Sequence, residues 1–227
     1  MSSVSKGRVE LSVTGPRPLA AAALVLEERF QRAITYEEPP YIDPAGLGPG
    51  PGSMSIPRSG SIRIEYAEGE TAGAVLGRVV QAHERAGNAG KFSVVVVGAR
   101  VDLVPRAYRS AAGGLVEWTP LLDTVVTLPR GRMNGLQFIE RLTTALHADR
   151  GHVVQIGTVP VNLLAQDSAA DSEGPTEARR LLGVRLGRLA RHLSWQLLAG
   201  PGSEDFVLNI HQVRGRPALS NSSNEHV

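Results

Sequence analysis

Residues 92–104 read FSVVVVGARVDLV, and this stretch indicates a β-hairpin. A β-rich run at 92–97 is followed by a tight Gly-Ala-Arg turn and by a second extended run at 101–104. Valine favours strands, and glycine favours the short turn between them. Upstream, apolar residues recur three and four positions apart over residues 71–86, which is typical of a helix with one buried face. The sequence therefore predicts a helix followed by two antiparallel strands.

A strand–helix–strand segment precedes this unit. Residues 9–14 alternate apolar and polar side chains, residues 19–31 have one apolar helical face, and residues 34–36 return to an extended pattern. Residues 43–60 are rich in glycine, proline and serine and predict a mobile loop. Residues 61–66 alternate again, so we expect this loop to join two neighbouring strands.

The second half of the chain repeats the same order of elements. We expect strands at 124–128 and 152–156, helices at 134–148 and 175–192, a polar loop at 165–174, and a closing hairpin from 194–198 and 206–211.

Short patterns in the two halves also correspond, at a repeat length of about 105 residues, a usual size for one domain. Residues 13–17 (VTGPR) match 126–130 (VTLPR). We therefore predict an α+β fold of two similar βαβ-αββ units, each with a small mixed sheet packed with two helices. The units cover residues 1–112 and 113–214, and residues 215–227 form a disordered tail.

The composition is that of an ordinary globular protein. Hydrophobic residues make up 42% of the 227 residues and charged residues 20%, so we expect a packed core. The net charge of +2 is too small to indicate a polyanionic partner by itself. The absence of cysteine excludes disulfides, thiol nucleophiles and cysteine-ligated metals. No window predicts a membrane-spanning helix, and the first ten residues lack the apolar core of a signal peptide.

The pattern resembles the short N-terminal domain of secretins and TonB-dependent transducers. Residues 18–22 (PLAAA) followed by 34–38 (ITYEE) are similar to the opening helix and second strand of that family. Residues 178–213 resemble uncharacterised bacterial proteins that carry such domains. The resemblance implies a non-enzymatic, periplasmic or envelope-associated interaction module, although the sequence itself shows no export signal.

Three local patterns were weighed as reactive sites. The glycines at 46–52 are interrupted by prolines and lack a following lysine, which argues against a phosphate loop. His147, His152 and His211 could approach one another, but no carboxylate or cysteine pattern accompanies them, so we expect no metal. The carboxylates at 37, 38 and 43 are interpreted as a solvated strand end beside a loop.

Four residues are the candidates for an interaction surface. Tyr36 and Tyr41 bracket two prolines and could form an exposed aromatic contact. Arg185 and Arg188 lie in an arginine-rich helix at 176–192 and could form a basic stripe. An exposed face of solvated arginines explains the same pattern. The helix carries no interleaved aromatic residues, which disfavours single-stranded nucleic acid.

We therefore expect a protein-interaction or scaffolding module that is not an enzyme. We expect no catalytic residues, no cofactor and no metal, and a partner that is another protein, bound through an exposed strand edge. The sequence leaves the partner's identity and the oligomeric state open. The alternative is an anionic-surface or nucleic-acid binder that uses the helix at 176–192, and a third reading is a hydrolase with an unfamiliar site.

Overall fold

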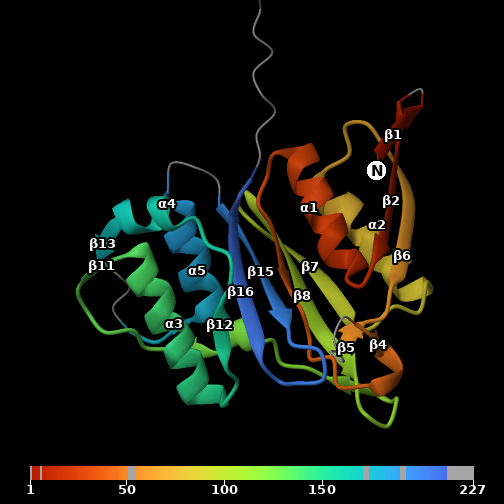
Figure 1. The fold of residues 1–227 in the computed structure, drawn as a ribbon. Helices are drawn as coiled ribbons and strands as arrows, with labels where there is room; N and C mark the ends of the chain where they lie inside the picture. Colours follow the sequence, from red (N-terminus) through yellow and green to blue (C-terminus); the bar gives the residue numbers. More distant parts are fainter. Residues whose placement is uncertain (1, 6, 51–54, 171–173, 190–192, 214–227) are drawn as a thin grey trace, which may run out of the picture.

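A seven-stranded mixed sheet runs through the centre of the molecule (Figure 1). The computed structural model describes residues 2–5, 7–50, 55–170, 174–189 and 193–213. The strands of the sheet, in spatial order, are β12 (Val154–Ile156), β16 (Phe206–Gln212), β15 (Leu193–Ala199), β3 (Ile34–Glu37), β8 (Arg100–Arg109) and β7 (Lys91–Val97), with β9 (Leu115–Glu117) beside β8. The α+β class predicted from the sequence is confirmed.

Apart from β9, the sheet consists of two three-stranded blocks with the same internal arrangement. In the first block, β3 is parallel to β8, and β8 is antiparallel to β7. In the second block, β12 is parallel to β16, and β16 is antiparallel to β15. The blocks are joined because β15 pairs with β3 in parallel. The two halves thus share one sheet instead of having a separate small sheet each, and their duplication stays a prediction that superposition would test.

The helices of the first half are buried between two layers of strands (Figure 1). Helices α1 (Pro18–Phe30) and α2 (Ala72–Arg85) pack on the first block. Their other side is covered by a three-stranded antiparallel sheet of β1 (Ser2–Ser5), β2 (Arg8–Gly15) and β6 (Gly60–Ala67). Alternating residues of β2 and β6 point into this core, as the sequence pattern predicts.

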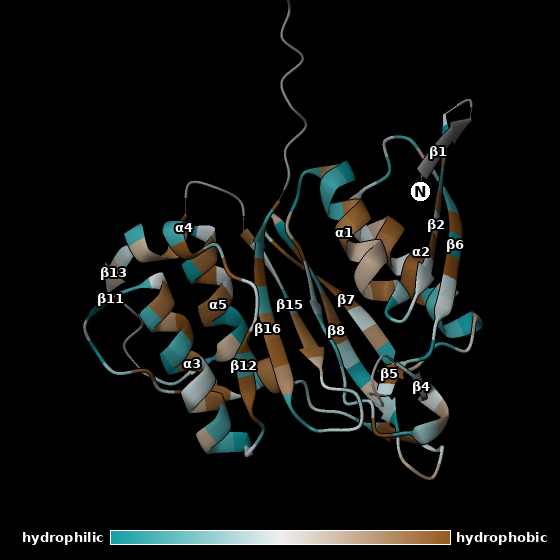
Figure 2. Cartoon of the chain, in the orientation of Figure 1, coloured by the Kyte–Doolittle hydropathy of each residue, from teal (hydrophilic) through white to brown (hydrophobic). Residues whose placement is uncertain are grey.

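The helices of the second half, α3 (Gly135–Arg150), α4 (Val161–Gln166) and α5 (Ala178–Gly187), cover the opposite face of the sheet (Figure 1). Successive residues of a strand point to opposite faces. In β15, Trp195 and Leu197 lie in the second core, whereas the Gln196 amide reaches the Ala20 carbonyl of α1. Figure 2 shows hydrophobic residues along β15 and β7.

Short strand pairs complete the second half. β10 (Val125–Val126) pairs with β14 (Thr176–Glu177), and β11 (Arg132–Asn134) pairs with β13 (Ser168–Ala170). Helix α3 begins at a capping box, in which the Asn134 side chain accepts from the Gln137 amide and the Gln137 side chain accepts from the Asn134 amide. A 3₁₀ turn at Leu121–Asp123 leads into β10.

The structure corrects three details of the predicted elements. The 43–60 segment contains a 3₁₀ turn (Pro44–Gly46) and the pair β4 (Leu47–Pro49) and β5 (Ser55–Pro57), and residues 51–54 lie outside the described part. This segment joins β3 to β6, which belong to different sheets and are not neighbours. The helix predicted at 175–192 is limited to the ten residues of α5, because residues 176–177 form β14. No helix in the described ranges is long and apolar enough to span a bilayer.

Candidate functional site

The junction between β15 and β3 brings the two halves of the chain together. Its backbone pairing is short, with Gln196 opposite Tyr36 and Leu197 opposite Glu37. The Glu38 amide extends it by donating to the Leu197 carbonyl at 2.8 Å. Buried polar side chains on both sides of this short ladder supply further contacts between the halves.

Glu38 lies at one end of the junction and is completely buried. Its Oε2 accepts from Arg17 Nε at 2.8 Å and from the Ala199 amide at 2.9 Å, and its Oε1 accepts from the Tyr36 hydroxyl at 3.2 Å. Arg17 also donates to the Ala199 carbonyl at 2.8 Å. Burial raises the pKa of Glu38, and the Arg17 charge opposes this increase. Glu38 therefore links β15 to the N-terminal end of α1.

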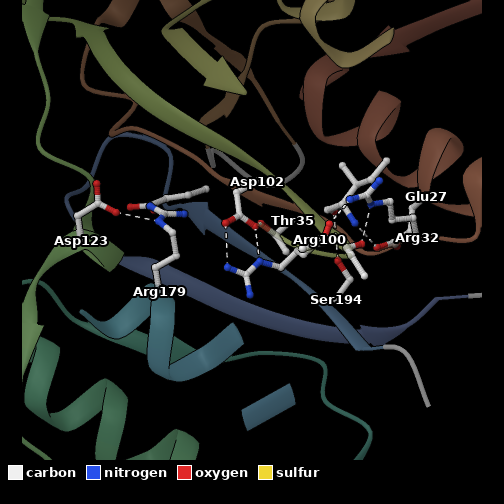
Figure 3. Close-up of polar contacts among 12 residues, drawn as sticks. Glu27, Arg32, Thr35, Arg100, Asp102, Asp123, Arg179 and Ser194 are labelled. Atoms are coloured by element: carbon white, nitrogen blue, oxygen red, sulfur yellow. Dashed lines mark hydrogen bonds and ion pairs between the residues drawn. The ribbon is translucent and has the colours of Figure 1, made fainter. Parts of the chain in front are cut away.

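Glu37 makes a second link, on the other face of the sheet. Its carboxylate, also fully buried, pairs with the guanidinium of Arg179 on α5 and accepts from the Leu122 amide at 3.2 Å. Arg179 also donates from Nε to Asp123 at 2.8 Å, a contact that Figure 3 shows. Burial raises the pKa of Glu37, and Arg179 opposes the shift. Glu37 thus fixes α5 against the first block.

A third polar group lies near Arg179 and joins β3 to β8 (Figure 3). Buried Asp102 on β8 accepts from the Thr35 hydroxyl at 2.7 Å and from Arg100 at 2.6 and 3.0 Å. The Arg100 guanidinium lies 4.9 Å from the centre of the Trp195 ring on β15, within range of a cation–π contact. Each of these carboxylates is matched by an arginine and by further donors, so the group positions the halves and presents no free acid to a substrate.

The prediction that Tyr36 forms part of an exposed aromatic surface is wrong. Tyr36 is only 2% exposed, because its strand is central and its ring stacks on Phe92 at 5.7 Å. Tyr41 is partly buried against the second core and forms a backbone bridge with Pro201. Burial raises the pKa of the Tyr41 phenol, and the nearby Glu38 charge adds to the effect. These rings stabilise the junction instead of forming an exposed aromatic surface.

The prediction that Arg185 forms part of an exposed basic stripe is wrong. Its side chain is 1% exposed, pairs with Asp167 at 2.7 Å and donates to the carbonyls of Met133 and Ala169. Arg188 is exposed at the C-terminal cap of α5. Residues 190–192, at the end of the predicted helix, lie outside the described residues. Helix periodicity places Arg185 and Arg188 on one side of the helix. It contains no information about the 167–170 segment, which buries Arg185.

The carboxylate cluster differs from expectation. Glu37 and Glu38 are buried in ion pairs instead of solvated, and the Asp43 carboxylate accepts from the Ala45 amide at 2.9 Å. His211 pairs with Glu27 at 2.6 Å, whereas His147 contacts the His152 backbone carbonyl. Within the described ranges, no group of three or more acids and histidines could hold a metal ion.

An open hollow of about 670 Å³ lies beside the 43–60 segment, in the first half. Asp43, Arg58 and His83 are among its lining residues. Their polar groups are engaged locally, since Arg58 donates to the Leu47 carbonyl and His83 Nε2 lies 2.8 Å from the Ala89 carbonyl oxygen. The hollow therefore does not gather histidines and acids from both halves.

The outer edge of β7 is an exposed surface that contains none of the four candidate residues predicted from the sequence. Val96 and Val97 are 56% and 48% exposed, and in the described part of the chain no strand pairs with β7 on its outer side. The run of four valines at 94–97 is the signal that the sequence offers, and by itself it predicts a strand but not an edge strand. Position at the sheet edge depends on the strand order, which periodicity does not contain.

The backbone of β7 presents unpaired groups at this edge. A two-residue turn, with Gly98 at φ +57°, closes the hairpin and pairs Val97 with Arg100. Residues that flank such a turn exchange hydrogen bonds, and the pairs alternate along the ladder. The amide and carbonyl groups of Phe92, Val94 and Val96 therefore point outward. Phe92 is opposite Pro105, which has no amide to donate, and this agrees with the alternation.

Comparison with family models, with curated proteins and with solved structures finds no match to this chain.

Proposed function

We propose that this protein is a non-enzymatic interaction module that binds an extended protein segment as an added strand at the edge of β7. The observation that carries the proposal is the outward-facing backbone of β7 beside exposed Val96 and Val97. Unpaired amide and carbonyl groups at a sheet edge are ready to pair with another strand.

The rest of the molecule supports a rigid edge. Behind the edge, Phe92 and Val94 pack into the first core, and α2 packs along β7. The buried ion pair of Glu37 with Arg179 and the contact of Glu38 with the Ala199 amide fix the first half to the second. An edge held in this way is preorganised, which lowers the entropy lost on binding. The resemblance to short N-terminal domains of secretins favours the same class of function.

The arginine-helix alternative has less support. Arg179 and Arg185, two of its five arginines, are buried in ion pairs with acids of the same chain, so they are not offered to an anionic surface. No specific contact in the described residues favours a hydrolase.

A displayed library of extended peptides tests the proposal. We expect selected peptides to bind the wild-type protein, and we expect Val96→Lys to weaken their binding at least tenfold, because an edge lysine opposes strand addition. Val125→Lys is the matched control, since Val125 is 55% exposed on strand β10. Equal binding by all three proteins would contradict the proposal.

A further inference from the structure

We propose that the strand added to β7 comes from a second copy of this chain, whose β12 edge pairs with β7 in parallel and extends the sheet from one molecule to the next. This inference rests on the proposed function and names its partner. It is drawn from a junction that the chain already contains, namely the parallel pairing of β15 with β3.

The two blocks make the comparison direct. β15 is the hairpin strand at the edge of the second block, and β7 is the corresponding strand of the first block. Likewise, β3 pairs in parallel with the hairpin strand β8 in the first block. Its counterpart in the second block is β12, which pairs in parallel with β16. Inside the chain, the β15 edge of one block meets the β3 edge of the other. Among the described residues, the two outer edges of this sheet, β7 and β12, have no strand beyond them, and they are the same two kinds of edge.

The strand directions also fit. Following the pairings across the sheet from β12, through β16, β15, β3 and β8, gives β7 the same direction as β12. A second molecule displaced along the sheet therefore brings its β12 parallel to β7 of the first. This is the orientation of the internal junction. The helices then alternate between the two faces of the extended sheet, as they do within one molecule.

The hydrogen-bonding groups are complementary. The Phe206 amide donates to the Val153 carbonyl and the Gly157 amide to the Leu208 carbonyl, so these groups of the β12 segment point toward β16. The groups of Val154 and Ile156 then point to the open edge, because alternate residues of a parallel strand face opposite sides. The β7 edge offers the corresponding groups of Val94 and Val96 to them.

The side chains at the two edges are mainly apolar and carry no like charges against each other. Ile156 is 40% exposed on β12, and Val96 and Val97 are exposed on β7. β12 has only three residues, and no acid in it corresponds to Glu38 of the internal junction. Pairing between molecules is therefore weaker than pairing within the chain. Its head-to-tail geometry does not close on itself in a dimer, so it gives open chains of molecules.

Sedimentation velocity of the full chain over a wide concentration range tests this. We expect the wild-type weight-average mass to rise with concentration beyond a dimer, whereas Val96→Lys and Ile156→Lys each stay monomeric. An equimolar mixture of the two variants should form dimers and nothing larger, because it restores one intact β7 edge and one intact β12 edge. Val125→Lys, the matched control, should behave as wild type. Circular dichroism checks that each variant is folded.

Other outcomes separate the alternatives. If Val96→Lys prevents association and Ile156→Lys does not, the contact is a symmetric pairing of two β7 edges and the inference is overturned. A wild-type protein that is monomeric at every concentration also overturns it. In that case, peptide binding that is still sensitive to Val96→Lys would leave the proposed function standing. Loss of both results would remove both proposals.

Discussion

His83 is a buried histidine on the core-facing side of α2, with its ring edge-on to Phe92. Nε2 donates to the Ala89 carbonyl, and Nδ1 has no hydrogen-bond partner among the residues that the structure describes. Burial lowers the pKa of His83, and the Ala89 carbonyl opposes this decrease. The neutral ring is therefore the form that the folded protein accepts.

This lowered pKa predicts that the protein loses stability in mild acid. Below the unfolded histidine pKa of about 6.5, the unfolded chain binds a proton that the folded protein refuses. The contribution is fully present above that pH and is lost as the pH falls toward the folded pKa, by at most about 1.4 kcal/mol per pH unit. Urea unfolding from pH 8 to pH 5 measures it.

The variant His83→Gln should flatten this part of the profile, because glutamine does not titrate. His147→Gln, at an exposed position of α3, is the matched control. Identical slopes for wild type and His83→Gln would show that other groups cause the acid sensitivity.

The burial of the polar residues at the junction could not be predicted from the local sequence. Glu37 and Glu38 precede two prolines and a glycine-rich segment, so local sequence favoured a solvated position. Their arginine partners are 142 residues away for Glu37 and 21 residues away for Glu38. Periodicity describes neighbours on one element and contains no information about such distant pairs. The burial of Tyr36 and Arg185 was missed for the same reason.

Among the elements, the start of α3 has the most specific local signal. The Asn134 side chain accepts from the Gln137 amide at 2.9 Å, and the Gln137 side chain accepts from the Asn134 amide at 3.0 Å. We expect Asn134→Ala to lower the free energy of unfolding by about 1 kcal/mol, as loss of a cap does. Asn134→Asp, which keeps an acceptor, should retain most of this stability. Urea titrations of both variants give the comparison, and a neutral alanine variant would contradict it.

The long elements of the chain were predictable because each buries one face. The patterns at 9–14, 19–31, 71–86 and 134–148 match β2, α1, α2 and α3 within one or two residues. Of the shortest elements, β10 lies within the strand predicted at 124–128, but β14 falls in the helix predicted at 175–192. β10 and β14 have two residues each and depend on each other, since Val125 is opposite Glu177. Such strands exist only because tertiary contacts bring distant segments together.

For the whole molecule, the important feature is that one sheet serves two cores on its opposite faces. Order and direction of elements within each half follow from the sequence, and the α+β class is confirmed. The union of the halves does not follow, because the pairing of β15 with β3 links residues about 160 positions apart and leaves no periodic signal. The open edges of β7 and β12 result from that union.

The junction residue Glu38 should control whether the two cores unfold together. Glu38→Ala removes the acceptor of Arg17, Tyr36 and the Ala199 amide, and breaking a buried ion pair of this kind costs about 3–5 kcal/mol. Both tryptophans, Trp118 and Trp195, lie in the second half, so their fluorescence reports that half, whereas far-ultraviolet circular dichroism reports both.

We expect the two signals to coincide during urea unfolding of the wild type and to separate in Glu38→Ala, because the halves then lose the buried carboxylate that binds both Arg17 and the Ala199 amide. Glu65→Ala is the control, since its exposed pair with Arg8 is worth at most about 1 kcal/mol and lies far from the junction in the small sheet. Coincident transitions in Glu38→Ala would mean that the β15–β3 ladder and the remaining contacts couple the halves without this carboxylate. In that case the first half, which carries the β7 edge, would unfold together with the second half even in the variant.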